Sequence, residues 1–445
     1  MASSSEPGLG SLLRAAGFRR LLIGQAVSGL GDWVATLALI AFAFQLSNRS
    51  QTAVAVVLVI RLVPPIFAAP VGGLLADRLD RRVMMVSCDI LRGGLICLIP
   101  IFHTIAVLYV IAFVHECISL FFLPARDASV PELAPEGTLP LANGLMLASS
   151  FGSIPFAAAL FSALRFAAGH VPDWLPFAEL ARSHPQALAF FFDAATFMVS
   201  AAMISGVQIP RHEEGAALHL FSGLAEASRF AWRNPLLRSL GEGLLVSMFG
   251  GGVLFAIGIA YIHQTLGGSD IDFGWLAALW GAGMGIGLAA VRFLIRERGA
   301  SIVVLAGVVG CGGVLIVMSL LPYLWLSFIV AVVFGAAFSI AITVALSIAQ
   351  QVTEDRLRGR IMGGVQMLFR VGLGAGALGM GGLANAIDVI HPGIGGIDVR
   401  MDGNQVGMFA GGVIILAGAL AATGVLAQRK PLQETEAPAA DPTAG

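Results

Sequence analysis

Long apolar stretches, separated by short polar turns, run along almost the whole chain. Each stretch has about 20 residues or more, the length that an α-helix needs to cross the hydrocarbon core of a bilayer. The pattern therefore predicts a succession of transmembrane helices. The twelve predicted spans are 21–46, 52–76, 83–102, 104–123, 141–168, 187–207, 236–263, 273–295, 300–321, 323–349, 361–385 and 405–427.

Two boundaries need separate arguments. Runs 83–102 and 104–123 touch, and they are divided only by Pro100 and the weakly polar pair His103 and Thr104. Run 21–46 is longer than the apolar core of a signal peptide, which has about 7–15 residues. It is therefore predicted to remain in the protein as the first membrane helix.

Composition supports a membrane protein and excludes several other classes. The mean hydropathy is +0.86, and only 12% of the residues are charged, which is outside the range of soluble domains. With a net charge of −1 and no basic face, nucleic acid is not expected as a partner. All of the cysteines lie inside apolar runs, so a disulfide framework is not expected.

Residue usage also limits the chemistry of the chain. The single lysine, Lys430, lies in the C-terminal tail, so a Walker A loop for ATP is not expected. The chain has no metal-binding motif of the H-E-x-x-H kind and no nucleophile elbow. We therefore expect neither an enzyme nor a bound cofactor or metal, and energy coupling would have to come from an ion gradient or from a separate subunit.

The arginines predict the orientation of the spans. With the N-terminus inside, the cytoplasmic segments hold 19 basic residues, whereas the opposite side holds only Arg49, Arg165, Arg182 and Arg400. Under the positive-inside rule both termini are expected in the cytoplasm.

The same pattern predicts the domain organisation. Residues 208–235 are more polar and separate six spans from six, and 218–232 has the spacing of an amphipathic helix on the membrane surface. The predicted units are a cytoplasmic segment 1–20, an N-terminal bundle 21–207, the linker 208–235, a C-terminal bundle 236–427 and a disordered tail 428–445.

Short motifs in the connecting segments resemble those of a known family. The densely charged turn 73–82, GLLADRLDRR, resembles the signature loop between the second and third helices of the Major Facilitator Superfamily, with Asp80 where that family usually has glycine. Further motifs that resemble one branch of this family are at 123–133, 141–144, 192–197, 230–238 and 358–360.

The resemblance implies a fold and a mechanism. That branch contains macrolide, multidrug and enterobactin-type siderophore exporters. An all-α membrane protein of two six-helix bundles is implied, with twelve transmembrane helices, both termini in the cytoplasm, and transport by alternating access. The resemblance does not name a cargo.

Charged groups inside the spans are the candidates for function. A charge at mid-membrane costs at least about 2.5–3.5 kcal/mol on insertion scales, so each should face a cavity or a partner. In the resembled fold, spans one and four line the central cavity. A desolvated carboxyl group there can take up a proton near neutral pH. The candidate residues for proton or cargo binding are Asp32, His115, Glu116, Arg61 and Arg370.

Other embedded charges are expected to be structural. Asp89 and Arg92 are one helical turn apart in span three and can pair. Asp193, near the outer end of span six, is placed in the same class. Proton-coupled exporters of the superfamily commonly carry an arginine inside span four, whereas this chain has none there before Arg126 at the cytoplasmic end.

A cytoplasmic gate and a hinge complete the predicted machinery. In the resembled fold the charged turn lies at the mouth that opens and closes, where Asp77 can cap a helix of the other bundle. The expected gate residues are Gly73, Asp77, Arg78, Arg81, Arg82, Asp89, Glu132, Glu354, Arg358 and Arg360. Pro155 is the expected hinge of span five, although Ile154 replaces the adjacent glycine of the exporter motif.

Together these features predict a monomeric exporter in the inner (plasma) membrane. It would move a small amphipathic or apolar molecule (a drug, siderophore or metabolite) by alternating access, with proton exchange as the drive. Two alternatives remain open at this point, namely a lysophospholipid or lipid flippase on the same fold, and a membrane accessory protein that transports nothing.

Overall fold

The computed structural model describes residues 8–64, 79–175, 177–209, 229, 232–351, 353, 355–390, 393–394, 397–398 and 400–426. The predicted gate residues Gly73, Asp77, Arg78 and Glu354, most of the linker 208–235, and the tail 428–445 lie outside the described residues. For Arg358 and Arg360 only the helical backbone is described.

The described part is almost entirely helical. Its first half contains α1 (Leu9–Arg14), α2 (Ala16–Leu46), α3 (Gln51–Leu62), α5 (Arg81–Leu98), α6 (Ile105–Leu133), α7 (Leu139–Phe151), α8 (Ile154–Ala168), α9 (Ala178–Ser183) and α10 (Ala187–Ser205). Its second half contains α12 (Pro235–Ala260), the π-helical turn η1 (Tyr261–Thr265), α13 (Asp270–Arg298), α14 (Ala300–Leu320), α15 (Leu324–Gln351), α16 (Asp355–Ala386) and α17 (Gly403–Leu426).

Two short hairpin pairs lie between α16 and α17. Strand β1 (Val389–Ile390) pairs with β4 (Met401–Asp402), and β2 (Gly393–Ile394) pairs with β3 (Ile397–Asp398), both antiparallel. In the first pair Val389 lies opposite Asp402.

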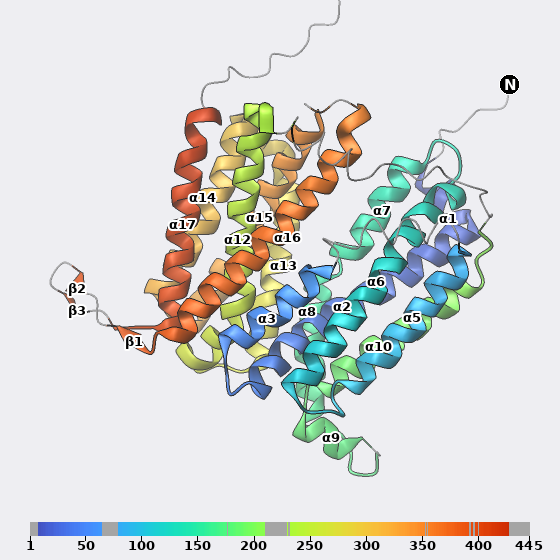
Figure 1. The fold of residues 1–445 in the computed structure, drawn as a ribbon, viewed down its shortest axis with the longest axis horizontal. Coiled ribbons are helices and arrows are strands. Elements are labelled where there is room, and N and C mark those ends of the chain that lie inside the picture. The colour runs from blue at the N-terminus through green and yellow to red at the C-terminus, as the bar shows by residue number, and fades with distance from the viewer. Residues whose placement is uncertain are drawn as a thin grey trace, which may run out of the picture.

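The helices form two bundles that lie side by side (Figure 1). In the N-terminal bundle α10 packs against α2 and α5, and α5 packs against α6. In the C-terminal bundle the main pairs are α13 with α15, α12 with α16, and α14 with α15 and α17. The bundles meet where α3 packs on α16 and α8 packs on α13. One apolar core cluster contains residues of both bundles.

Ten helical segments of the described chain are long and apolar enough to cross a membrane. Helices α3 and α5 overlap the predicted second and third spans but do not meet the same criteria. The described part of α3 is a shorter apolar helix, and α5 carries charged residues at its start and in its middle. An all-helical, multi-span fold is therefore confirmed, whereas the count of twelve crossings and the orientation of the termini stay predictions.

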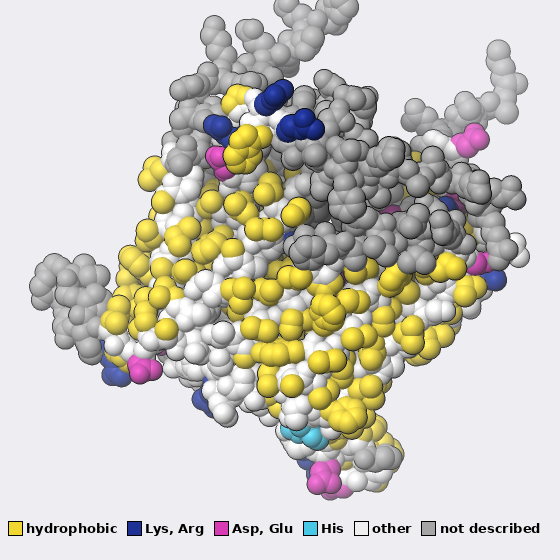
Figure 2. All heavy atoms as spheres, in the orientation of Figure 1, with side chains coloured by type: hydrophobic (Ala, Val, Ile, Leu, Met, Phe, Trp, Pro, Cys, Tyr) yellow, Lys and Arg dark blue, Asp and Glu magenta, His cyan; other side chains and the backbone are white. Residues whose placement is uncertain are grey.

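The surface agrees with burial in a bilayer. Figure 2 shows hydrophobic side chains over most of the visible middle of the molecule, while the visible charged side chains gather toward its two ends. Several large apolar side chains point outward along the helices, such as Val110 on α6, Phe293 on α13 and Ile329 on α15. Outward apolar residues are stable when lipid, rather than water, surrounds the helices.

Glycines let two helix pairs approach closely. A Cβ atom on Gly376 of α16 would lie 2.0 Å from the carbonyl oxygen of Phe249 on α12. Likewise, a Cβ on Gly283 of α13 would lie 2.1 Å from the carbonyl oxygen of Val332 on α15. Without an apolar driving force between helices in lipid, such backbone contact is a main source of attraction.

Span five is divided into α7 and α8 at residues 152–153. Gly152 ends α7, and Pro155 stands in the first turn of α8, where its missing N–H breaks no helical hydrogen bond. A Cβ on Gly281 of α13 would lie 2.9 Å from the nitrogen of Pro155. The expected hinge residue therefore packs tightly on the other bundle, at a break in its own helix.

Substitution of Gly376 tests the close packing of α12 on α16. Gly376→Ala should destabilise the protein by about 1–3 kcal/mol, because overpacking forces the backbones apart. Gly379→Ala on the same helix is the matched control, since nothing lies within 4 Å of its added Cβ. Melting temperatures of the two purified variants in detergent measure the effect, and equal melting temperatures would contradict the packing described here.

Candidate functional site

Five helices of the N-terminal bundle bring ionisable side chains together inside the membrane region. Asp32 lies in the middle of α2, Arg61 near the end of the described part of α3, and Glu116 in the middle of α6. Helix α5 contributes Asp89 and Arg92, and the remaining members are His115 of α6 and Asp193 of α10. The side chains around this group are mostly apolar, so the charge of each member has to be balanced by other members of the group.

Arg61 connects α3 to the two helices that carry the candidate acids. Its Nε lies 3.6 Å from Oε2 of Glu116, with both side chains mostly buried. A guanidinium N–H of Arg61 also donates to the hydroxyl of Thr36, whose own hydroxyl donates to the Asp32 carbonyl oxygen at 2.6 Å. Arg370 of α16, in the other bundle, lies within electrostatic range of Glu116. The predicted candidates thus form one connected set across the bundle interface.

Arg92 is held in the core of its own bundle. It forms a buried ion pair with Asp89, one helical turn earlier. Its guanidinium carbon lies 4.4 Å from the ring centroids of both Phe122 and Phe197. Such a cation between two aromatic faces is stabilised by both rings. Asp89, which we expected among the gate residues, therefore has its partner on its own helix.

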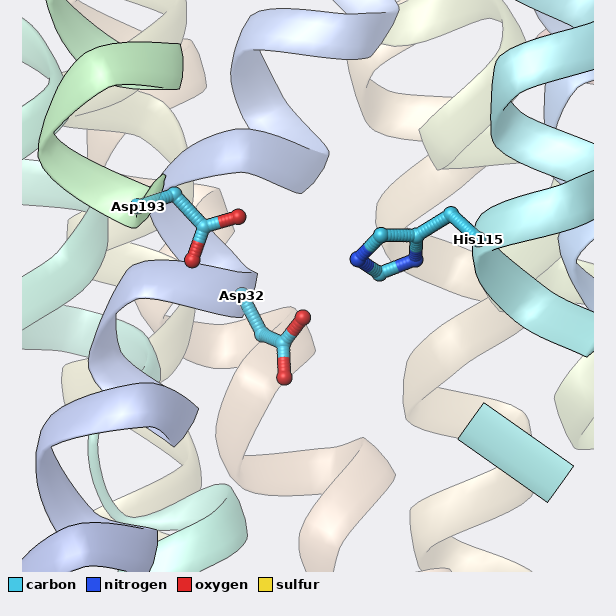
Figure 3. A group of neighbouring side chains, drawn as sticks. All are labelled: Asp32, His115 and Asp193. Atoms are coloured by element: carbon cyan, nitrogen blue, oxygen red, sulfur yellow. The ribbon is translucent and has the colours of Figure 1, made fainter. Parts of the chain in front are cut away.

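Asp193 was expected to be structural, but it joins two of the candidate residues. Asp32, His115 and Asp193 each offer an oxygen or nitrogen atom, and these atoms lie within 4.8 Å of one another. Figure 3 shows the three side chains directed toward one space between α2, α6 and α10. Asp193 is fully buried and His115 is 5% exposed. The signal for Asp193 was present in the sequence, because it is a charge in an apolar span.

The described gate residues make local contacts. Arg81 lies 3.9 Å from Glu132 and donates to the carbonyl oxygen of Ala128 at 3.0 Å, which ties the start of α5 to the end of α6. Asp80, the departure from the family motif, caps α5, because its carboxylate accepts from the backbone N–H groups of Arg82 and Val83 at 3.0 and 3.1 Å. The extra acid thus stabilises a helix start.

A charged cluster that was not expected from the sequence joins the two bundles at the end of the molecule opposite to α1, here termed the distal end. Asp270, at the start of α13, is 6% exposed. Its carboxylate lies 2.8 Å from Arg165 of α8 and 2.7 Å from Nε2 of His263, and it accepts from Gln186 at 3.1 Å. We call Arg165, Gln186, His263 and Asp270 the distal lock.

A second polar cluster lies at the same end. The side-chain amide of Gln51 on α3 donates to Gln264 at 2.9 Å and to Asn404 of α17 at 2.7 Å. Asn404 in turn donates to Gln264 at 3.0 Å. We call Gln51, Gln264 and Asn404 the amide cluster. Both clusters connect the bundles, so the polar contacts across the interface between described residues gather at the distal end.

Two histidines stack beside the distal lock. The rings of His103, before α6, and His184, between α9 and α10, have centroids 4.1 Å apart. Burial lowers the pKa of His184, and the neighbouring His103 lowers it further. The pair is therefore most stable when His184 is neutral.

The arrangement of two helical bundles, with embedded charges in one and a polar interface at one end, agrees with comparisons to known proteins. A family model described as "transmembrane secretion effector" (MFS_3) matches residues 10–439. The chain belongs to this family of Major Facilitator transporters. The resemblance expected from the charged turn is thereby confirmed, and the family and fold are those of transporters.

Individual relatives of this transporter support the assignment. It is 31% identical over 277 residues to the uncharacterized MFS-type transporter YfiS of Bacillus subtilis, and the match spans 60% of this chain and 62% of YfiS. It is 24% identical over 386 residues to the multidrug efflux pump Tap of Mycobacterium tuberculosis, which covers 81% of this chain and 84% of Tap.

A solved structure shares the fold of this transporter. It is a bacterial homologue of the human lysosomal transporter Spinster in an inward-facing and unoccupied conformation, with a TM-score of 0.73 at 15% identity. The match covers 93% of this chain and 97% of that chain.

Loss of the distal lock should open the distal interface of the transporter. Removing one partner of a buried charge pair weakens an interface by about 2 kcal/mol or more, so the interface should open at least about 30-fold more often. We expect Asp270→Asn to speed maleimide labelling of a Ser162→Cys reporter by that factor, in a variant without native cysteines. Ser162 is buried between α8 and α13, where its hydroxyl donates to the Ile271 carbonyl oxygen at 3.0 Å.

The matched control for this labelling experiment is Asp173→Asn. Asp173 also pairs with an arginine, Arg182, but its side chain is 87% exposed and the pair lies within one connecting segment. Labelling should be unchanged in this control. An equal labelling rate in Asp270→Asn and Asp173→Asn would show that the lock does not hold the bundles together.

Proposed function

We propose that this transporter exports a small amphipathic or apolar molecule across the inner (plasma) membrane by alternating access, driven by proton entry. The observation that carries the proposal is the charged group of α2, α3, α6 and α10, which lies inside the membrane region of a transporter fold. Ionisable groups at that depth are costly, and in transporters they mark ion or substrate pathways.

Alternating access is supported by the uneven interface between the bundles. The distal lock and the amide cluster hold the distal end together. With the orientation expected from the arginines, the distal end is the outer side, and this conformation faces inward. In the opposite state the charged turn 73–82 acts as a latch on the cytoplasmic side, where Arg81 of the turn already lies 3.9 Å from Glu132 of α6.

Proton coupling is supported by the candidate acids. In the proposed cycle Asp32 or Glu116 takes a proton from outside, cargo leaves, and release of the proton inside resets the transporter. Arg61 joins the two sites, since it donates to Thr36 one helical turn after Asp32, acts electrostatically on Asp32 and pairs with Glu116. A change of charge at one acid therefore alters the partners of the other. Binding and release of a proton need no cofactor and no ATP.

The cargo class is supported by an apolar crevice between the bundles, which is nearly closed in this conformation, with a free volume of about 20 Å³. It is lined by Leu37 of α2 and by Leu254, Phe255, Trp280 and Phe334 of the C-terminal bundle. Leu37 follows Asp32 by five residues, a rise of about 7.5 Å along the helix. Once opened by movement of the bundles, an apolar surface about one and a half helical turns from a carboxyl group would suit an amphipathic molecule. The direction of transport is supported by the relative Tap, a multidrug efflux pump. We propose that the transporter works as a monomer.

Transport into inside-out membrane vesicles tests this function. With ethidium and a panel of other fluorescent amphipathic dyes as probes, a pH gradient should drive uptake of at least one dye, and a protonophore should abolish that uptake. Asp32→Asn and Glu116→Gln should each reduce gradient-driven uptake at least about tenfold, because the loss of a side chain that transfers a proton commonly lowers a rate by that factor or more.

The control for the vesicle experiment is Asp127→Asn, since Asp127 is a carboxylate of α6 whose side chain is 64% exposed. It should transport like the wild type. Dye uptake that continues unchanged after the gradient is collapsed would refute proton coupling. Full activity of Asp32→Asn would remove the role assigned to that residue.

A further inference from the structure

Asp193 is buried and has no ion-pair partner among the described residues. It lies on α10 and is fully inaccessible to solvent. Its Oδ1 accepts from the hydroxyl of Thr196 at 3.2 Å, whereas its Oδ2 has no hydrogen-bond partner among the described residues. A buried carboxylate oxygen in this position is costly unless a proton or a donor satisfies it.

The backbone of α2 is shaped to admit Asp193. A Cβ atom on Gly31 would lie 2.4 Å from Oδ1 of Asp193 and 2.1 Å from Oγ1 of Thr196. Glycine at position 31 therefore lets the carboxyl group of Asp193 lie beside Asp32, the next residue of α2. The ring of His115 faces the same space, and its Nε2 also has no partner among the described residues. Two polar atoms without a hydrogen-bond partner among the described residues therefore belong to side chains that face the same space.

The charges around this space come from every neighbouring helix. Arg92 and Asp89 on α5 form one pair, and Arg61 on α3 and Glu116 on α6 form another. Arg370 on α16 acts on Glu116, and Cys97 on α5 lies within electrostatic range of Asp193. With Asp32 and Asp193 the connected set has four carboxylates and three guanidinium groups. With His115 neutral, the set carries one net negative charge.

We propose that Asp193 is a proton-binding residue of the transport cycle, and that Asp32, His115 and Asp193 together hold one proton as a single unit. This inference rests on the proposed proton coupling. Two neighbouring carboxylates in a medium of low dielectric do not both stay ionised, so one proton between them relieves their repulsion. The same proton neutralises the whole set and satisfies the open oxygen of Asp193 or the open nitrogen of His115. No bond other than an O–H or N–H bond forms or breaks.

Two carboxylates and an imidazole are also ligands that a divalent transition metal accepts. The charge balance favours a proton, because a divalent cation would leave the set with one net positive charge. Arg92 and Arg61 both act on Asp193, and both would repel the metal.

Infrared spectroscopy of the full-length transporter in lipid detects the proton without knowledge of the cargo. A protonated carboxyl group has its own C=O stretching band, which should be present at neutral pH in the wild type and shift in deuterated water. In Asp193→Asn three carboxylates balance three guanidinium groups, so the band should be lost. Asp32→Asn should lose it for the same reason, and Asp127→Asn should keep it.

A second variant separates the role of Asp193 from a folding defect. Gly31→Ala retains every acid but forces Asp193 away from Asp32, so the band should weaken or move while the protein stays folded. Folding of each variant is checked by gel filtration and thermal melting. A structural role for Asp193 would change melting and leave the band in place.

The outcomes distinguish this inference from the proposed function. A band that depends on Asp32 or Glu116 but survives Asp193→Asn would overturn the inference and leave proton coupling intact. Absence of any protonated-carboxyl band in the wild type would contradict both. A protein without the band that binds one zinc ion, and loses that binding in Asp193→Asn, would overturn the inference in favour of a metal site.

Discussion

The need to compensate charge inside an apolar bundle is the constraint on which the rest of this structure depends. An uncompensated charge at mid-membrane costs at least about 2.5–3.5 kcal/mol, and the N-terminal bundle contains several. Two of the arginines each have a carboxylate partner, Arg61 with Glu116 and Arg92 with Asp89. Asp32 and Asp193 lie beside His115, so the carboxylates that have no arginine ion pair are gathered at one place.

Close helix packing makes this arrangement possible. Gly31 brings the carboxyl group of Asp193 next to α2, and glycines such as Gly376 and Gly283 bring helices of the C-terminal bundle into backbone contact. The two bundles are joined by a mixed interface, in which polar contacts between described residues cluster at the distal end. A change of charge in one closely packed bundle can then alter how it meets the other, which is what alternating access requires.

Much of the fold was predictable from the sequence, because hydropathy over about 20 residues is a strong signal for a membrane helix. Asp32, His115 and Glu116 were found for the related reason that charge is rare in such runs. Asp193 was detected but judged structural, since the contact between α10 and α2 depends on Gly31 and cannot be seen in one span alone. The distal lock was missed because Arg165 and Asp270 lie at helix ends, where charged residues are ordinary.

The central claim is that protonation of the embedded acids is coupled to opening and closing at the two ends of the molecule. Spin-label distances test it most directly, with one pair at the distal end, Phe166→Cys and Trp325→Cys, and another at the opposite end, Val83→Cys and Phe293→Cys, all exposed positions. The account predicts that a change of pH alters the two distances in opposite senses, and that Asp32→Asn abolishes the response. Distances that ignore pH, or that lengthen and shorten together, would contradict it.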